Sequence, residues 1–197
     1  MDELVLSRPR DARALRSRAA LREALLALIA EKPLELISIR EIALRAGVSF
    51  PTFYRQYPTR DALLDDIAAS EIGELLAIPQ PLMAQRDTRI SSLAIVSFVS
   101  DRKDLWRTLL TTGATAAMRE EFIRRSRDIA ASQVRYNPGL PVDLMAPLVA
   151  GGMFEILSWW LRQTGDVPVG YVAQLLEILV IAPSVSRQDI ALPKGAA

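Results

Sequence analysis

The stretch SIREIALRAGVSFPTFYRQYPTR, residues 38–60, has the pattern of two short helices joined by a tight turn. Ser38 and Glu41 have the spacing of a capping box, in which each side chain satisfies a backbone N–H at the start of a helix. The first helix should therefore begin near Ile39. Gly47 adopts left-handed backbone without a Cβ penalty, so this helix should end beside it and the chain should reverse.

The second helix should run from Phe50 to about Tyr57, with Ser49 as its cap and Pro51 in its first turn. Phe53 and Tyr57 are four residues apart and suit the core. The other side chains lie near its start or on its outer face, where a recognition helix presents residues to base edges in the major groove. They are Phe50, Thr52, Tyr54, Arg55 and Gln56.

A third helix should start at Thr59, after Pro58 closes the second. Arg60 lies in its first turn, where an arginine side chain and free backbone amides could hold a DNA phosphate. The stretch as a whole therefore predicts a helix-turn-helix that binds double-stranded DNA.

Residues 39–64, IREIALRAGVSFPTFYRQYPTRDALL, resemble the TetR family of bacterial transcriptional regulators, and the resemblance extends from Leu21 to Asp66. The shared pattern is a short helix, A-G-V-S, a T-x-Y recognition helix, an aromatic residue with a turn, and a basic residue before A-L-L. It implies base contacts by Arg40 and Thr52, phosphate contacts by Tyr54 and Arg60, and specificity positions at Phe50, Arg55 and Gln56. The complete DNA-binding set that we predict is Ser38, Arg40, Ser49, Phe50, Pro51, Thr52, Tyr54, Arg55, Gln56 and Arg60.

Three residues depart from the family pattern. Pro51 replaces a frequent glycine, which could stiffen the recognition helix, and Arg60 replaces the usual lysine while keeping the charge. Gln56 stands where histidine is common. The DNA sequence that this site recognises therefore cannot be copied from relatives.

Charge is uneven along the 197 residues, whose net charge is +1. Residues 1–60 contain 11 Lys and Arg against 7 Asp and Glu, whereas the remainder contains 13 against 16, so the end with the DNA-binding pattern is the basic one. Histidine and cysteine are absent, which excludes Ser-His-Asp catalysis, histidine metal sites and disulfides. We expect no catalytic residue, metal or cofactor, no signal peptide, and a cytoplasmic location.

The fold should be all-α, with about nine helices in two domains, because helical spacing of apolar residues recurs without strand alternation. Residues 1–60 form the DNA-binding domain, with residues 1–12 as a basic arm that is either solvated or in contact with DNA. The first long helix runs from Arg13 to Lys32, and its core stripe is Leu21, Ala24, Leu25, Leu28 and Ile29. A linking helix spans residues 59–77 and keeps Asp65, Asp66, Glu71 and Glu74 mostly outside. Pro79 and Pro81 then mark the start of an effector and dimerisation domain, residues 78–197.

That second domain should contain helices at about Thr88–Ser100, Lys103–Thr112, Thr115–Tyr136, from near Asp143 onward, and Pro168–Ala182. Apolar side chains at helical spacing, including Leu93, Val96 and Val99, build its core. Candidate walls of an effector pocket are Phe98, Trp106, Met118, Phe122, Met153, Glu155 and Trp159. For each of these, packing in the core remains the alternative, and for Glu155 the alternative is a solvent strip with Ser158 and Arg162.

The last two helices carry more apolar surface than one subunit can cover, which predicts a homodimer built on them, with Leu176 at the contact. Packing of Ala150, Gly151 and Gly152 within one subunit is the alternative. The apolar run from Met145 to Leu161 is too short and too broken for a membrane span.

The leading hypothesis is a homodimeric repressor of an inverted-repeat operator, released by an unidentified small apolar or aromatic effector. The resemblance implies that the effector tilts the linking helix and changes the spacing of the two recognition helices. The alternative is a DNA-binding or protein-binding scaffold without an effector.

Overall fold

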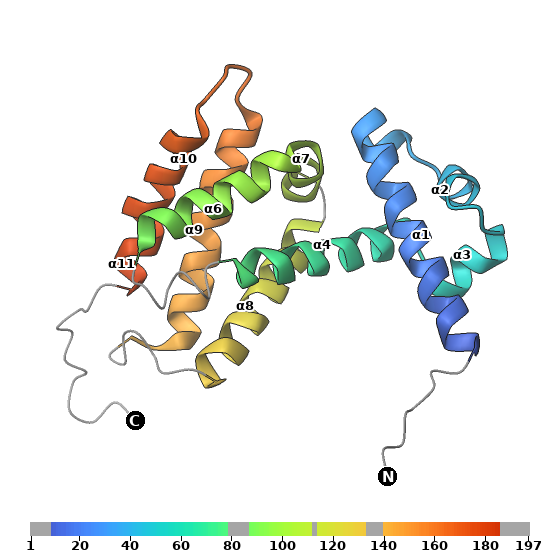
Figure 1. Ribbon diagram of the computed structural model, residues 1–197, viewed down its shortest axis with the longest axis horizontal. Helices are drawn as coiled ribbons and strands as arrows, with labels where there is room; N and C mark the ends of the chain where they lie inside the picture. The colour runs from blue at the N-terminus through green and yellow to red at the C-terminus, as the bar shows by residue number, and fades with distance from the viewer. Residues whose placement is uncertain (1–8, 79–86, 112–113, 133–139, 186–197) are drawn as a thin grey trace, which may run out of the picture. The chain divides into compact units, whose positions relative to one another are not determined.

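The computed structural model describes residues 9–78, 87–111, 114–132 and 140–185, and the fold class is all-α as predicted. Within those ranges no residue forms a β-strand, and nine helices are present if the continuous rod at the C-terminal end counts as one (Figure 1). Contacts divide the chain into two compact units, Met1–Ile67 and Ala68–Ala197. The division falls inside helix α4 (Arg60–Ala77), so each unit includes about half of that helix.

Unit 1 contains α1 (Pro9–Glu31), the short 3-10 turn η1 (Leu34–Leu36), α2 (Ile39–Arg45), α3 (Phe50–Gln56) and the first half of α4. Helix α1 packs against both α2 and α3. The predicted stripe on α1 is confirmed as core, since all five of its apolar side chains are buried. Ile42 of α2 and Phe53 of α3 are fully buried with it, so the two short helices rest on one apolar face.

The first helix begins four residues earlier than predicted, at Pro9 rather than Arg13. Proline is favourable in a first helical turn, because its missing N–H would have no partner there and its φ angle is already helical. Part of the predicted N-terminal arm is therefore helix, and residues 1–8 lie outside the described residues.

Unit 2 contains the second half of α4, α6 (Thr88–Asp101), α7 (Lys103–Thr111), α8 (Ala114–Ser132), α9 (Val142–Arg162) and α10 (Val169–Leu176). Helix α9 packs against α7, α8 and α10, and α6 packs along α10 (Figure 1). The predicted boundary prolines, Pro79 and Pro81, and the predicted end of α8 at Tyr136 lie outside the described residues.

Helix α6 buries only part of the predicted face, since Val96 and Val99 are core as predicted and Leu93 is not. Leu93, predicted to be core, is 45% exposed, whereas Ser91 and Ser92 are buried beside Val96 and Val99. The Ser92 hydroxyl donates to the Thr88 carbonyl at 2.8 Å, so its polar atom is satisfied within the helix. A serine whose hydroxyl bonds backward to the helix can occupy a core position, and for this reason apolar spacing alone did not identify Ser91 and Ser92 as core residues.

Helix α9, which was predicted from near Asp143 onward, is continuous through Pro147 and the glycine pair, which had been expected to break the apolar run. A proline near the N-terminal end removes only one intrahelical bond. By length and composition alone α9 could cross a membrane. Its packing instead makes it a core helix, because Ala150, Met153, Phe154 and Leu157 are buried in unit 2.

The C-terminal rod also continues beyond its predicted end. Helix α10 passes into a π-helical turn, η2 (Glu177–Ile181), and then into α11 (Ala182–Val185). The N–H of Ala182 donates to the Glu177 carbonyl, five residues back. Pro183 follows directly after this turn, in the first turn of α11, so the proline that was predicted to end the helix lies within it.

Candidate DNA-binding surface

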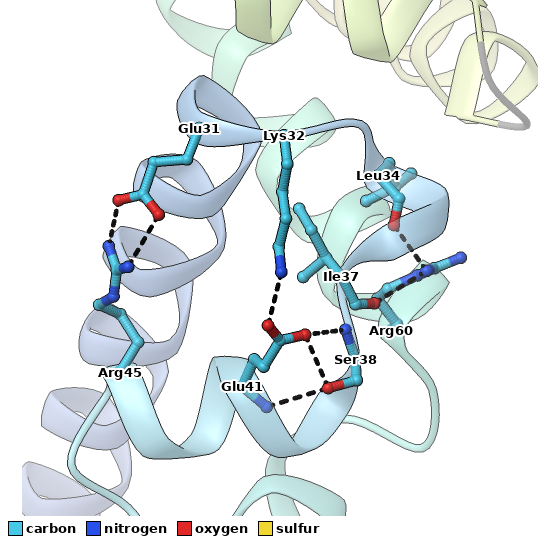
Figure 2. A network of polar contacts seen from close by, with 8 residues as sticks. All are labelled: Glu31, Lys32, Leu34, Ile37, Ser38, Glu41, Arg45 and Arg60. Atoms are coloured by element: carbon cyan, nitrogen blue, oxygen red, sulfur yellow. Dashed lines mark hydrogen bonds and ion pairs between the residues drawn. The ribbon is translucent and has the colours of Figure 1, made fainter.

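The start of α2 is fixed by the predicted capping box (Figure 2). The Glu41 carboxylate accepts from the backbone N–H of Ser38 at 2.9 Å, and the Glu41 N–H donates to the Ser38 hydroxyl at 3.2 Å. Lys32, the residue after α1, makes an ion pair with the same carboxylate. These contacts lower the pKa of Glu41 to about 2, with the Lys32 hydrogen bond as the largest cause and the Ser38 bonds next. Ser38 is therefore committed to capping, although it remains at the surface.

The turn between the two short helices follows the predicted backbone. Gly47 has φ of 64°, the left-handed region that other residues rarely adopt, and it is the positive-φ glycine of the described chain. The N–H of Val48 donates to the Ala43 carbonyl at 3.0 Å, which closes the end of α2. This turn sets the direction in which α3 leaves α2.

Polar side chains form a stripe along α3. The Ser49 hydroxyl caps the helix by accepting from the Thr52 N–H at 3.3 Å, and it lies 2.8 Å from the Thr52 hydroxyl. Arg55, one turn further on, donates to the Thr52 hydroxyl at 3.3 Å. Ser49 and Arg55 are exposed and Thr52 is half-buried, so the stripe offers hydroxyl groups at the start of the helix and a guanidinium in its last turn.

Aromatic side chains form the second feature of α3. Phe53 and Tyr57 are 0% and 2% exposed, as predicted for core residues. Phe50 and Tyr54 are 48% and 47% exposed and lie edge to face, with 5.1 Å between their ring centroids. Two large rings therefore remain at the surface of this helix. Pro51, the second residue of α3, is exposed and helps start the helix.

Arg60 has a structural role that the sequence did not indicate. Its Nη1 donates to the carbonyl oxygens of Leu34 at 2.8 Å and Ile37 at 3.0 Å, which joins α4 to the segment that leads into α2 (Figure 2). Its Nε is buried without a hydrogen-bond partner and lies 3.6 Å from the Asp61 carboxylate. The predicted phosphate contact would have to use the remaining part of this guanidinium.

A second polar cluster also escaped prediction. The Tyr57 hydroxyl donates to Asp66 of α4 at 2.5 Å, and Arg18 of α1 donates to the same hydroxyl at 3.3 Å. Arg18 and Arg22 both lie 3.8 Å from the Asp66 carboxylate. Burial and then the Asp66 hydrogen bond raise the pKa of Tyr57. The available signal was a tyrosine at a core position, because its buried hydroxyl needs a partner.

Positive charge remains available on this surface. Arg45 is paired with Glu31 through two hydrogen bonds of 2.7 and 2.9 Å. Arg40 and Arg55 are exposed, and no carboxylate of the described ranges forms an ion pair with either. Gln56 is half-buried at the end of α3. The arrangement can therefore offer two exposed guanidinium groups, hydroxyls and aromatic rings to a polyanion such as DNA, whose base edges carry a pattern of donors and acceptors.

The predicted effector residues lie in different environments within unit 2. Trp106, Met118, Phe122 and Met153 are buried, and Phe98 is half-buried. The side chain of Glu155 is 81% exposed and lies 3.7 Å from Arg162, so within this chain it belongs to the surface and not to a wall shared with the buried set. Trp159 is 38% exposed, and Ser158, predicted to be in the solvent strip, is buried.

Glu71 corrects another expectation. It is 6% exposed although the sequence placed it outside, and its carboxylate accepts from Trp106 Nε1 at 3.2 Å. Arg102 lies within 4.0 Å of Glu71 and donates to Glu74 at 3.2 Å, while its guanidinium covers the Phe98 ring at 4.2 Å. Trp106 and Phe98 thus take part in a polar clamp that holds the second half of α4. Across the described ranges no group of three or more acidic residues could hold a metal ion.

Residues 21–67 match the model of the bacterial regulatory proteins of the tetR family. The HTH-type transcriptional regulator EthR of Mycobacterium tuberculosis is 34% identical over 81 residues, which cover 41% of this chain but only 32% of EthR. EthR of Mycobacterium bovis gives the same values. The sequence similarity to these relatives is therefore confined to part of their length.

Solved structures resemble the chain over most of its length, at lower identity. A TetR transcriptional regulator from Streptococcus agalactiae has a TM-score of 0.59 at 19% identity and covers 87% of this chain and 97% of its own. FadR of Thermus thermophilus, a TetR-family repressor solved with lauroyl-CoA, has a TM-score of 0.59 at 18% identity over 89% and 99%. RolR, solved with resorcinol, has a TM-score of 0.56 at 17% identity over 93% and 98%. These likenesses establish the fold.

Proposed function

We propose that this chain, whose N-terminal helix-turn-helix belongs to the TetR family of bacterial regulatory proteins, is a cytoplasmic, homodimeric transcriptional repressor released by a small-molecule effector. The observation that carries the proposal is the exposed surface of α3. Its N-terminus is capped, its buried side is anchored on α1, and its outer side presents Thr52 and Arg55 beside exposed Arg40 of α2. No catalytic residue is assigned, because regulation needs only differential binding.

The dimer part of the proposal rests on exposed apolar side chains of the last two long helices. Leu144, Leu148 and Trp159 of α9 are 59%, 61% and 38% exposed, and Ile178 and Leu179 of η2 are 58% and 62% exposed. Each helix also has a buried side within unit 2. A second copy of the chain would cover these stripes, and a two-fold dimer would match an operator with inverted half-sites.

The effector part rests on the apolar interior between α8 and α9. Phe122 and Phe154 lie edge to face with 5.7 Å between ring centroids, and Met118 and Met153 are buried with them. FadR and RolR, which share the fold, were solved with lauroyl-CoA and resorcinol. An apolar or aromatic effector would suit side chains of this kind, and exposed Glu155 gives no support to a cationic one.

Effector coupling would run through α4, whose two halves belong to the two units. The clamp of Glu71 on Trp106 and Arg102 fixes the second half of the helix to α7 and to the end of α6. An effector with different affinities for two conformations of the clamped α4 would shift the population of the DNA-binding state. The coupling free energy would be about 1–3 kcal/mol.

The DNA-binding proposal is tested by selecting an operator from random duplexes with the full chain. Dissociation constants for that operator and for a random duplex are then compared. We expect Arg40→Ala and Thr52→Ala to weaken operator binding more than random binding, because groups that read base edges carry specificity and phosphate contacts do not. Equal losses on both DNAs, or failure to enrich any inverted repeat, would contradict the assignment.

The effector proposal is tested by thermal shift with lauroyl-CoA, resorcinol and a cationic aromatic compound, together with native mass spectrometry of the purified chain. A ligand at 100 times its dissociation constant adds about 2.7 kcal/mol to the free energy of unfolding. Stabilisation by an apolar or aromatic compound, reduced in Phe122→Ala, is expected. Stabilisation only by small, highly polar compounds would contradict the apolar lining.

A further inference from the structure

The aromatic side chains of unit 1 form a continuous series from the surface of α3 to its core. Ring centroids are 5.1 Å apart for Phe50 and Tyr54, 5.6 Å for Tyr54 and Phe53, and 6.3 Å for Phe53 and Tyr57. The first two contacts are edge to face, the arrangement that aromatic quadrupoles favour. Because Phe53 and Tyr57 are buried, the two exposed rings are supported from below.

Packing within the chain does not account for the outer ring. Phe50 is the first residue of α3 and remains 48% exposed, although a polar residue at this position would keep the same helix start. The orientation of its ring is restricted by Tyr54, and its backbone is restricted by the proline that follows it. A ring held in this way loses little conformational freedom when a partner covers it, so its contact contributes more to affinity.

The polar stripe on the same helix defines what such a partner would present. Ser49, Thr52 and Arg55 can bond the polar edges of bases, whereas Phe50, the first residue of the helix, offers only an apolar surface. In the major groove the apolar feature of the base edges is the 5-methyl group of thymine. A cytosine presents a hydrogen in place of that methyl group and an amino donor in place of the thymine O4 acceptor.

We propose that Phe50, supported by Tyr54, is a specificity-determining residue that recognises the thymine 5-methyl group in each operator half-site. The inference rests on the proposed DNA-binding function and extends it to a base and an atom. Each half-site should contain one thymine at which the methyl group, and not the hydrogen bonds of the base, determines affinity.

The test uses the full chain and its selected operator, in which each thymine is replaced in turn by uracil. Uracil pairs as thymine does but lacks the methyl group. We expect one position per half-site at which the dissociation constant rises about fourfold, the effect of one buried methyl group, and little change elsewhere. Replacing a cytosine placed at that position by 5-methylcytosine should recover part of the loss.

Protein variants then assign the effect. Phe50→Ala should bind the thymine and uracil operators equally, while Phe50→Leu, which keeps an apolar side chain, should retain part of the difference. Gln56→Ala is the matched control on the same helix and should keep the full difference. Thr52→Ser tests whether the Thr52 methyl group makes the contact instead, because it removes that methyl and leaves the hydroxyl that contacts Ser49.

The outcomes separate this inference from the function on which it rests. Failure of the chain to bind any selected duplex would overturn both. Specific binding with no uracil-sensitive position would overturn the role of Phe50 and leave the DNA-binding function standing. A uracil effect that persists in Phe50→Ala would also overturn the role of Phe50, because it would report DNA shape. An effect that disappears only in Thr52→Ser would overturn it too, because the methyl contact would then belong to Thr52.

Discussion

Arg60 illustrates how one residue can join segments that are distant in sequence. Its guanidinium donates to two backbone carbonyls 26 and 23 residues earlier, at Leu34 and Ile37. Both bonds come from Nη1 alone, which the rigid guanidinium plane holds in place. A lysine, which the resemblance implies as the usual residue here, carries its ammonium on a flexible stem and would lose more conformational freedom in holding it between the two oxygens.

We therefore expect Arg60→Lys to lower the free energy of unfolding by about 1–3 kcal/mol, the range for hydrogen bonds to a charged group. Urea unfolding measures it, with Arg40→Lys as the control, because Arg40 is exposed. An unchanged unfolding midpoint, combined with equal weakening on operator and random DNA, would show that Arg60 serves phosphate binding alone.

Glu41 predicts a pH dependence at the same scale. Its pKa in the folded chain is about 2, below the usual 4.5, because Lys32 and Ser38 stabilise the carboxylate. A pKa lowered by folding means that the unfolded chain binds the proton more readily. The contribution of this carboxylate is complete above pH 4.5 and is lost as the pH falls toward 2.

Carboxyl NMR titration of the folded chain should give a Glu41 midpoint near 2, and the variant Lys32→Met should raise it, because the largest cause is removed. The unfolding free energy of Glu41→Gln should vary less with pH in this window than that of the parent chain. A Glu41 midpoint near its usual value would contradict the capping geometry in solution.

At the scale of elements, two adjacent glycines of α9 have different surroundings. A Cβ on Gly152 would lie 2.8 Å from Val180 Cγ2 of η2, whereas a Cβ on Gly151 would lie 3.5 Å from the flexible Arg119 guanidinium. Gly152 thus allows η2 to approach α9 closely within one chain. For this residue, packing within one subunit, the alternative to a dimer contact, accounts for the missing side chain.

Gly152→Ala should lower the free energy of unfolding by about 1–3 kcal/mol, because the short, β-branched valine cannot move aside without strain. Gly151→Ala is its matched control and should leave stability unchanged or raise it by about 0.5–1 kcal/mol through helix propensity. Thermal and urea unfolding of both variants measure this difference in stability. Equal effects at the two positions would mean that the close approach at Val180 is not maintained.

At the scale of the whole molecule, the exposure of a residue in the last helix decides whether its substitution tests the proposed dimer contact or the core of unit 2. Leu176, which the sequence placed at the contact, is 0% exposed and belongs to the core of unit 2. Leu179, three residues later, is 62% exposed. A carboxylate at Leu176 should therefore unfold the unit, while one at Leu179 would lie at the proposed contact between copies.

Leu179→Glu should sediment as a folded monomer, with unchanged helical circular dichroism, because an apolar contact cannot accommodate an unpaired charge. Gln174→Glu, at an exposed polar position of the same rod, should leave the assembly unchanged. A folded Leu179→Glu variant that still sediments as a dimer would move the interface elsewhere.

The sequence by itself determined the features that depend on neighbours within about one helical turn. The capping box at Ser38, the positive φ of Gly47 and the start of α3 at Phe50 all arise from contacts between residues at most four apart, which a sequence states directly. The buried faces of α1 and α3 followed from the spacing of apolar side chains for the same reason.

Only the tertiary structure decided which polar side chains were enclosed. Glu71 is buried because Trp106, 35 residues later, reaches its carboxylate, and Tyr57 is bonded to Arg18, 39 residues earlier. Helical periodicity assigned Glu71 to the solvent side and Tyr57 to the core, and it identified the bonding partner of neither, since it counts polarity alone. The burial of Glu71 and the exposure of Leu179 depend on which helices meet, and that is fixed by long-range packing rather than by local pattern.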